Sequence, residues 1–554
     1  MLTVLLRALT LFSIVSGMTA AAAAPAAAPE RPKLVLVLVV DGLPQEQVQR
    51  YRHQFGQGGL RRLLDEGAWF SDAHHAHGIT VTAVGHAAML SGAYPYQHGI
   101  IGNNWIDPVT GKEVYCTDDI RHRYLGNEVT QPDNGTSPAR LRVTTLGDEL
   151  RYSNGSRSKV VAISGKDRGA ILLAGRTGTA YMYMDETGNF ASSSYYMDAH
   201  PAWVRRHQAA RPQDRYFNTE WKALLPEAAY LDDVPGHLQV AKPESPRALP
   251  IRVGSASAGA KPDGAYYGAL RGTPFLDELT LEFARAAVIG EDLGRNAAGV
   301  PDLLAVSLSA HDLINHNYGP ESRMSHDHLQ RLDRMLAGFF GFLEQRMGMD
   351  NVLVTFSADH GFANVPEFSA ARQLATGRLD DTRMVAALGK HLDDRFAIDQ
   401  LVRNASMPNI YLDYEKAERR GVRRADIDDA AARFLLAYEG VANVYTRTQL
   451  EGGSGSTRLD TLMRRAWHRQ ISGDLMVVIK PHWIYSSGSA GASHGTPYTY
   501  DTNVPLMLMG RRWIRPGAVS RYAEVVDLAP TLAHLLRVRP PAASEGRTLT
   551  EILR

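Results

Sequence analysis

Six residues of the types that bind divalent metals follow apolar stretches of the chain or lie in loops: Asp41, Asp312, His316, Asp359, His360 and His494. Asp312 and His316 are four residues apart, so both side chains face the same way if a helix or turn begins there. Asp359 and His360 are adjacent and converge only in an irregular turn, which Gly361 permits. Carboxylate and imidazole groups suit zinc, and the set supplies three ligands for each of two ions. The joint pattern predicts a two-metal site.

Each part of this pattern is weak when taken singly. An Asp-x-x-x-His pair is more often a surface pair or a cap, and Asp-His-Gly is often only a turn. Asp41 by itself is more often a helix cap or the start of a turn. The other histidines show no comparable pattern, and the local cluster of His74, His75 and His77 is interpreted as exposed or as supporting the ligands from outside.

The hydroxyl of Thr82 is the candidate nucleophile. It lies between a short β-prone piece at 79–81 and a helix-compatible piece at 86–91, which places it at a predicted strand-to-helix turn. There the side chain can cap the helix, and the free N–H groups of the helix make a local anion site. A cap is the commoner role for such a residue. A threonine hydroxyl becomes a useful nucleophile only when a base or a metal activates it, so the interpretation depends on the predicted metal site.

Alternating strands and helices must position these side chains. Residues 33–40 form a Val-rich apolar run, typical of a strand buried on both faces in a parallel sheet, and ligands gather outside the carboxyl ends of such strands. Further strands are predicted at 158–163, 302–308, 351–357, 474–480 and 504–509, and helical patterns at 45–66, 275–289 and 326–344. The alternation predicts an α/β fold with a mostly parallel central sheet sandwiched by helices.

Two stretches fit this alternation poorly. Residues 171–273 are rich in Tyr, Pro, Gly and Ser, and residues 365–473 carry many charges and a polar helix at 425–436. Both are interpreted as insertions that cover or border the site, because long excursions in α/β enzymes are usually functional. The predicted organisation is a signal peptide at 1–24, an Ala/Pro tether at 25–32 and one domain at 33–554 that carries both insertions.

Composition limits the partners and the compartment. The 554 residues include 60 basic (Lys and Arg) and 59 acidic ones, for a net charge of +1, so no broad positive surface argues for a nucleic-acid partner. Residues 1–24 are typical of a secretory signal; as a membrane anchor the apolar run is short and lacks a charged stop. We expect an exported, periplasmic or secreted monomer with no membrane span in the mature chain. Cys116 is the only cysteine, which excludes an intramolecular disulfide.

Seven motifs occur in an order that matches a known superfamily. They are Val40-Asp41-Gly42, Thr80-Val-Thr82-Ala-Val-Gly-His86, Gly102-Asn103-Asn104-Trp105, Gly165-Lys166-Asp167-Arg168-Gly169, Asp312-x-x-x-His316 followed by Tyr318-Gly-Pro-Glu-Ser322, Ala358-Asp359-His360-Gly361, and Ser493-His494-Gly495-Thr496. On these motifs the chain resembles the alkaline phosphatase superfamily. It is most similar to the phosphate-irrepressible, threonine-nucleophile alkaline phosphatases, which are related to the nucleotide pyrophosphatase/phosphodiesterases.

The resemblance implies an alkaline phosphatase-like fold and zinc-dependent hydrolysis of phosphate monoesters through a covalent phosphothreonine on Thr82. It implies one zinc held by Asp312, His316 and His494. The second would be held by Asp41, Asp359 and His360, with the Thr82 oxygen as a further ligand. Asn103, Lys166 and Arg168 match the positions that bind the non-bridging phosphoryl oxygens. Asn104 is the alternative to Asn103, which is preferred because it follows Gly102 directly.

The Lys166 and Arg168 pair bears on the substrate. Without the motifs, two cations one residue apart would ordinarily be a solvated turn. In a phosphoryl site they stabilise equatorial oxygens and favour monoesters, which carry more negative charge than diesters. A phosphodiesterase or nucleotide pyrophosphatase with the same metals is the alternative. A sulfatase is disfavoured because Cys116 lies outside a C/S-x-P-x-R motif, and an exported, non-catalytic metal-binding protein is the remaining possibility.

Overall fold

The fold is organised by a nine-stranded sheet within the described part of the chain, in the order β20-β2-β19-β12-β1-β11-β6-β7-β8. Its parallel centre consists of β12 (Val352–Ser357), β1 (Leu34–Val40), β11 (Asp302–Leu308), β6 (Val160–Ser164) and β7 (Thr179–Tyr183). The computed structural model describes residues 30–126, 135–230, 246, 248–254, 259, 261–453 and 455–554. The predicted signal peptide and most of the tether therefore lie outside the described residues.

The borders of the sheet depart from the parallel pattern. β19 (Leu506–Met509) runs antiparallel to both β12 and β2 (Ala68–Phe70), β20 (Gly517–Val519) is parallel to β2, and β8 (Phe190–Ala191) is antiparallel to β7. The predicted strand at 504–509 is thus part of the sheet but reverses its direction. The α/β class and the mostly parallel central sheet are confirmed.

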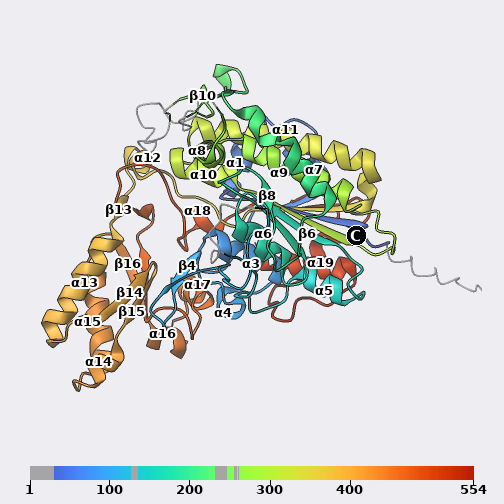
Figure 1. Cartoon of the computed structure of the whole chain (residues 1–554). Coiled ribbons are helices and arrows are strands. Elements are labelled where there is room, and N and C mark those ends of the chain that lie inside the picture. Colours follow the sequence, from blue (N-terminus) through green and yellow to red (C-terminus); the bar gives the residue numbers. More distant parts are fainter. Residues whose placement is uncertain are drawn as a thin grey trace, which may run out of the picture. The chain divides into compact units, whose positions relative to one another are not determined.

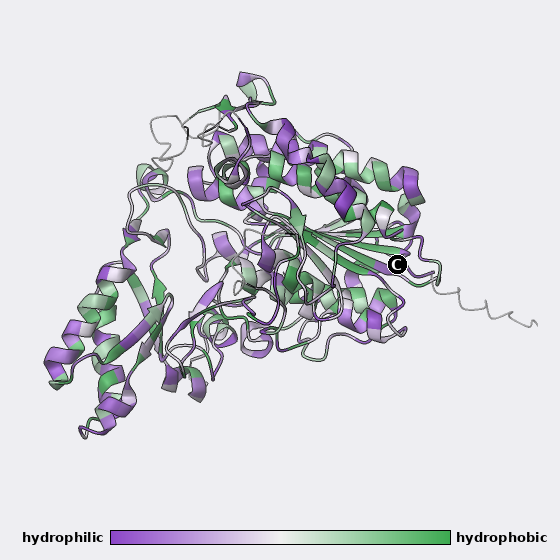
Figure 2. Ribbon diagram, in the orientation of Figure 1, coloured by the Kyte–Doolittle hydropathy of each residue, from purple (hydrophilic) through white to green (hydrophobic). Residues whose placement is uncertain are grey.

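Helices cover both faces of the sheet, as Figure 1 shows. On one face lie α2 (Leu60–Glu66), α7 (Ala202–Ala210), α9 (Phe275–Gly290), α10 (Ala310–Tyr318) and α11 (Arg323–Met347). On the other lie α3 (Thr82–Ser91), α5 (Leu146–Tyr152), α6 (Asp167–Ala174) and α19 (Leu528–Leu536). Every residue of β1 is fully buried, as the apolar run predicts for a central parallel strand, and the sheet is coloured largely hydrophobic in Figure 2. No helix in the described residues has the length and hydropathy of a membrane span.

Two local predictions are wrong. Residues 45–66 form two helices, α1 (Gln45–Tyr51) and α2, because the intervening glycine-rich loop is held by Asp333, whose carboxylate accepts the backbone N–H groups of Gly56 (2.8 Å) and Leu60 (2.7 Å). Residues 79–81 belong to no strand of the described sheets, and only Val81, the N-cap residue of α3, is shown to be extended. The Thr80 hydroxyl instead donates to the carbonyl of Thr496 at 2.7 Å.

The second predicted insertion contains a separate four-stranded antiparallel sheet in the order β14-β15-β17-β16. Its strands are β14 (Val402–Ser406), β15 (Asn409–Leu412), β16 (Val441–Thr446) and β17 (Leu475–Ile479), and α13 (Asp381–Phe396) lies beside α15 (Arg424–Leu436) against it (Figure 1). The predicted strand at 474–480 therefore belongs to this smaller sheet, beyond the predicted end of the insertion at 473. β17 itself is apolar throughout, and both of its faces are buried.

The two faces of β17 contact different cores. Leu475, Val477 and Ile479 pack with α13 and α15, whereas Met476 and Val478 pack in a cluster with Ile79 and Val84. Alternate side chains of a strand point to opposite faces, so each set follows from the strand period. The smaller sheet is thereby packed against the start of α3, which Thr82 begins.

The first predicted insertion, 171–273, includes β7 and β8, which belong to the central sheet, and the end of α6, which packs on it. The part that follows is anchored by the buried carboxylate of Asp327 on α11. This carboxylate accepts hydrogen bonds from the Trp221 indole at 2.6 Å, the Leu224 backbone at 2.6 Å and the Tyr230 hydroxyl at 2.7 Å. A charged acceptor with three donors ties the excursion to the helical layer.

Because both faces of β17 are buried, truncating either of two consecutive side chains should lower the free energy of unfolding by a similar amount. Leu475→Ala and Met476→Ala should each lower the free energy of unfolding by about 2–5 kcal/mol, because each leaves a cavity in a packed core. Denaturant titration measures the change. Lys390→Ala on the exposed face of α13 is the control and should shift stability by less than about 0.5 kcal/mol. Tolerance of either core substitution would contradict burial of that face.

Candidate active site

The predicted metal ligands lie at the carboxyl ends of three neighbouring strands. Asp41 follows β1, Asp359 and His360 follow β12, and Asp312 and His316 lie on α10 directly after β11. β1 pairs with both β11 and β12 in parallel register, so the three strand ends meet at one edge of the sheet. His494 reaches the same place from the loop after β18 (Trp483–Tyr485).

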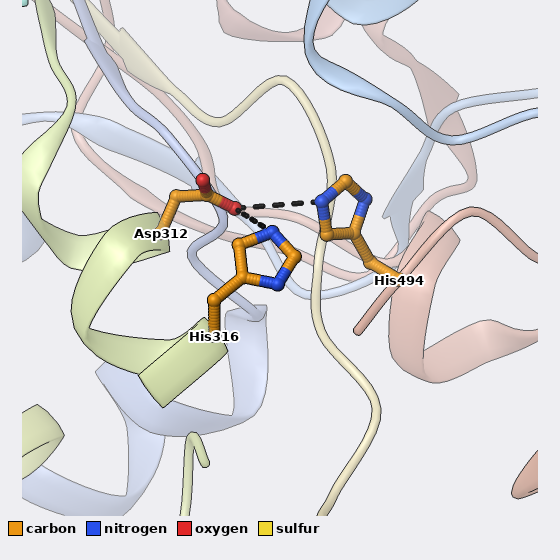
Figure 3. Close-up of side chains that lie close together, drawn as sticks. All are labelled: Asp312, His316 and His494. Carbon is orange, nitrogen blue, oxygen red and sulfur yellow. Dashed lines mark ion pairs between the residues drawn. The ribbon is translucent and has the colours of Figure 1, made fainter. Parts of the chain in front are cut away.

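All six predicted ligands converge. Figure 3 shows the Asp312 carboxylate turned toward His316 and His494, with Oδ1 3.4 Å from the Nε2 atom of each ring. The Nε2 atom of His360 lies 3.5 Å from Asp41 Oδ1, 3.6 Å from Asp359 Oδ2 and 4.0 Å from Asp312 Oδ1. Among the described residues, two groups have the spacing to hold an ion: Asp312, His316 and His494, and Asp41, Asp312 and His360. Asp312 thus stands in the second group where the resemblance implies Asp359.

The three imidazoles are oriented by backbone carbonyls. The Nδ1–H groups of His316, His360 and His494 donate to the carbonyls of Ala492 (3.0 Å), Gly361 (2.9 Å) and Thr80 (2.8 Å) respectively. A carbonyl only accepts, so in each ring Nδ1 carries a proton and Nε2 is the atom that faces the neighbouring predicted ligands. Such hydrogen bonds fix the ring and its tautomer at metal centres.

Several buried polar atoms of this cluster have no hydrogen-bond partner among the described residues: Asp41 Oδ1, Asp312 Oδ1, Asp359 Oδ2 and His360 Nε2. Leaving such atoms unsatisfied is costly, and the cost is greatest for charged groups. Divalent cations satisfy carboxylate oxygens and imidazole nitrogens together. The donor set and its unpaired atoms therefore fit the metal ions that the sequence predicts.

Lys166 lies between two of the carboxylates. Its Nζ is 2.7 Å from Asp41 Oδ2 and 2.6 Å from Asp312 Oδ2, and all three side chains are buried. Burial raises the pKa of Asp312, but Lys166 and the neighbouring imidazoles outweigh it and hold this pKa well below its usual range. For Asp41, burial and the charge of Asp359 outweigh Lys166 and raise the pKa. One ammonium group therefore does not neutralise the site.

His360 shows the same excess of negative charge. Burial alone lowers the pKa of an imidazole, but Asp359 and Asp41 raise that of His360 to about 9. A cation that binds through Nε2 must displace this proton, so metal binding at His360 is coupled to proton release.

Thr82 begins α3 and is buried, but it does not cap the helix. The N-cap residue is Val81, and no side chain makes the capping hydrogen bond. The Thr82 carbonyl instead accepts a hydrogen bond from His86 Nδ1–H at 2.8 Å. His86 Nδ1 also lies 3.1 Å from Asp359 Oδ2, and its Nε2 is 2.8 Å from the Ser307 hydroxyl. His86 joins the turn of Thr82 to the predicted ligand Asp359, a role that the sequence prediction missed although the residue lies in the same motif.

The proposed phosphoryl-binding residues lie at the starts of two adjacent helices. Asn103 Oδ1 accepts the Ala83 N–H at 2.9 Å at the start of α3, whereas Asn104 is exposed and bonds to Glu113. Lys166 is the N-cap residue of α6 and Arg168 lies in its first turn. α3 packs against α6, and through Lys166 the start of α6 contacts the predicted ligands Asp41 and Asp312.

The histidine cluster at 74–77 is buried, so the expectation that it is exposed is wrong. His75 donates from Nε2 to the carbonyl of Ala358 at 2.9 Å, directly before the predicted ligand Asp359. His74 contacts the Thr502 hydroxyl at 2.9 Å, and His77 is fully buried. Support of the ligands from outside, the other interpretation of the cluster, agrees with the position of His75.

The chain belongs to the type I phosphodiesterase/nucleotide pyrophosphatase family, whose model matches residues 35–501. A relative from Myroides odoratus named calcium-transporting ATPase is 32% identical over 530 residues, which are 95% of each chain. Alkaline phosphatase PafA of Elizabethkingia meningoseptica is 32% identical over 545 residues, 98% of this chain and 97% of the relative.

The fold agrees with these matches. The crystal structure of wild-type alkaline phosphatase PafA has a TM-score of 0.88 at 32% identity, and the match covers 95% of this chain and 100% of that one. The resemblance predicted from the seven motifs is confirmed.

A glycine on α3 makes the close approach to the metal ligands possible. A methyl group on Gly85 would clash with the backbone of Asp359, both at its carbonyl and at Cα. Gly85→Ala should therefore lower the free energy of unfolding by about 1–3 kcal/mol and weaken divalent-metal binding, because Asp359 is displaced. Chelator competition with zinc and denaturant unfolding measure the two effects.

Gly341→Ala on α11 is the matched control, because no atom lies within 4 Å of the added methyl group. It should leave metal binding unchanged and raise stability by up to about 1 kcal/mol. Equal tolerance of both substitutions would contradict the close packing of α3 on Asp359.

Proposed function

We propose that the protein is a zinc-dependent alkaline phosphatase that hydrolyses phosphate monoesters through a covalent phosphothreonine on Thr82. The observation that carries the proposal is the convergence of six metal-ligand side chains at strand ends beside the helix start that bears Thr82. The relatives support it, because both printed names denote phosphoryl hydrolysis.

The proposed ligand assignment follows the two sides of the cluster. Asp312, His316 and His494 would hold one zinc, and Asp41, Asp359 and His360 the other, with Thr82 next to it. Bound there, the two cations would favour the deprotonated Thr82 hydroxyl and neutralise charge on the departing oxygen. Asp312 occurs in both groups of side chains that have the spacing to hold an ion, so its carboxylate would lie next to both zinc ions.

The reaction then divides into two displacements at phosphorus. In the first, the Thr82 oxygen forms a bond to phosphorus as the ester P–O bond breaks, and the departing alkoxide takes a proton from water. In the second, water attacks the phosphothreonine, the Thr82 P–O bond breaks, and phosphate leaves. Asn103, Lys166 and Arg168 hold the equatorial oxygens in both steps, since phosphoryl transfer depends mainly on positioning and charge stabilisation.

Preference for a monoester follows from local charge. The chain as a whole is nearly neutral, yet Lys166 and Arg168 place two cations at the start of α6, where the helix itself favours anions. The extra charge of a monoester gains more from this arrangement than a diester does. The alternative favoured by the family description is a phosphodiesterase, which would use the same metals and nucleophile.

We infer that the mature protein is an exported monomer. The inference depends on the predicted signal at 1–24, which lies outside the described residues, and on the absence of any need for a second copy to complete the described site. Cys116, the one cysteine, is buried and free.

Removal of the nucleophile tests the covalent route. Thr82→Ala should lower kcat on an aryl phosphate monoester by more than about a thousandfold while zinc is still bound, because no oxygen remains to form the covalent intermediate. Steady-state kinetics with metal analysis measures both quantities. Thr82→Ser, which keeps the hydroxyl, is the control and should retain most of the activity. A Thr82→Ala protein with near-normal turnover would refute the proposal.

Substrate class is tested by zinc reconstitution and charge removal. Chelator should abolish hydrolysis and zinc should restore it, with kcat/KM higher for an aryl monoester than for the matching methyl diester. Arg168→Ala should lower monoester kcat/KM by about 10²–10³-fold, the usual cost of one oxyanion donor, and diester kcat/KM by less. Lys166 is less suitable for this substitution, because it also contacts the predicted ligands Asp41 and Asp312. Preference of the wild-type protein for the diester would establish the alternative.

A further inference from the structure

One carboxylate gathers the polar groups around Arg168. Asp167 Oδ1 accepts the Tyr115 hydroxyl at 2.6 Å and the backbone N–H of Arg168 at 2.7 Å. Its Oδ2 accepts the Thr117 hydroxyl at 3.1 Å and lies 3.4 Å from that of Tyr124. Three hydroxyl groups from the segment around β5 (Glu113–Tyr115) thus converge on the residue between Lys166 and Arg168.

The direction of each hydrogen bond follows from the chemistry of the groups. An ionised carboxylate only accepts, so the Tyr115 hydroxyl must spend its single proton on Asp167. The phenol oxygen is then left with acceptor capacity, which the Arg168 Nη1–H group uses at 3.2 Å. The bonds form a directed chain in which Arg168 donates to Tyr115 and Tyr115 donates to Asp167.

This series of hydrogen bonds keeps the positive charge of Arg168 available to a ligand. Asp167 is adjacent in sequence and a direct pair would be ordinary, yet no ion pair between the two side chains is formed within 4.0 Å, and the contact runs through Tyr115. In the described part of the chain the guanidinium makes one hydrogen bond, and its buried Nε–H has no partner. A guanidinium has five N–H donors in a planar fork that matches phosphate oxygens, so most of that fork remains for a ligand.

We propose that Tyr115 and Asp167 are positioning residues that hold Arg168 toward the transferred phosphoryl group and thereby set the preference for monoesters. The proposal rests on the proposed phosphatase function. Tyr115 fixes one terminal nitrogen of the guanidinium without consuming its charge, and Asp167 fixes the Tyr115 hydroxyl. Neither residue contacts the metal ligands in the structure, so their effect passes through Arg168.

A double-mutant cycle tests this coupling. Tyr115→Phe removes one hydroxyl and keeps the ring; it should lower kcat/KM for an aryl phosphate monoester about tenfold, within the range for residues in contact. The matching methyl diester should lose less than about twofold, because it depends less on Arg168. In an Arg168→Ala background, Tyr115→Phe should cost the monoester less than about twofold. Asp167→Asn, which removes the charged acceptor, should follow the same pattern.

Tyr124→Phe is the matched control. Its hydroxyl lies near the same carboxylate but makes no contact with Arg168 in the structure, so it should change the monoester-to-diester ratio little. Thermal unfolding of each variant separates loss of folding from loss of positioning. The proposal would be overturned if Tyr115→Phe lowered kcat/KM equally for both esters. It would also be overturned if Tyr115→Phe lowered monoester kcat/KM as much in the Arg168→Ala background as in the wild-type protein.

A second readout separates this inference from the proposed function. Calorimetric titration of zinc-loaded protein with inorganic phosphate gives the same cycle without turnover, and Tyr115→Phe should weaken phosphate binding only when Arg168 is present. If the wild-type protein fails to hydrolyse monoesters but phosphate binding shows coupling between Tyr115 and Arg168, the proposed function is wrong and the positioning role is supported. If monoesters are hydrolysed but neither the kinetic nor the phosphate-binding cycle shows coupling between Tyr115 and Arg168, the positioning role is wrong.

Discussion

The site depends on the burial of three like charges at one edge of a sheet. Asp41, Asp312 and Asp359 are all buried at adjacent strand ends. Carboxylates so placed repel one another and lose hydration, and Lys166 supplies a single compensating charge to two of them. The opposite pKa directions of Asp41 and Asp312 and the raised pKa of His360 reflect this imbalance. Divalent cations would resolve it, so the fold favours metal binding before any substrate is considered.

Close backbone approach makes this crowding possible. Gly42 has φ of +71°, and an added methyl group there would lie 3.1 Å from Asp312 atoms, so the turn after β1 requires glycine. The Asn315 amide donates to the Gly42 carbonyl at 3.0 Å, and the Gly42 N–H donates to Asp359 Oδ1 at 3.0 Å. The turn after β1 is thereby tied to both neighbouring strand ends. Together with Gly85 it fixes the spacing of ligands that come from distant parts of the chain.

The fold and the ligand residues were predictable where one short segment carries the information. The apolar run at 33–40 and the spacing of Asp312 and His316 are local patterns, and both appear in the structure as expected. Contacts between distant segments were not predictable: His86 with Asp359, His75 with Ala358 and Tyr115 with Asp167 depend on the folded arrangement. The errors at β17 and at 45–66 have the same origin, since an apolar strand does not reveal its sheet and a glycine-rich loop does not reveal the carboxylate that holds it.

The residues predicted to bind the transferred group are largely separate from the predicted metal ligands. The predicted metal ligands lie at or directly after strand ends and in one loop, whereas Lys166 and Arg168 lie at the start of α6 and Asn103 bonds to the start of α3. Only Lys166 belongs to both sets through its contacts with Asp41 and Asp312. Changes around Arg168 can therefore alter the charge presented to a substrate while the ligand geometry stays intact. If the proposed metal and anion sites are both present, their separation gives a physical reason why one fold can serve both monoesters and diesters.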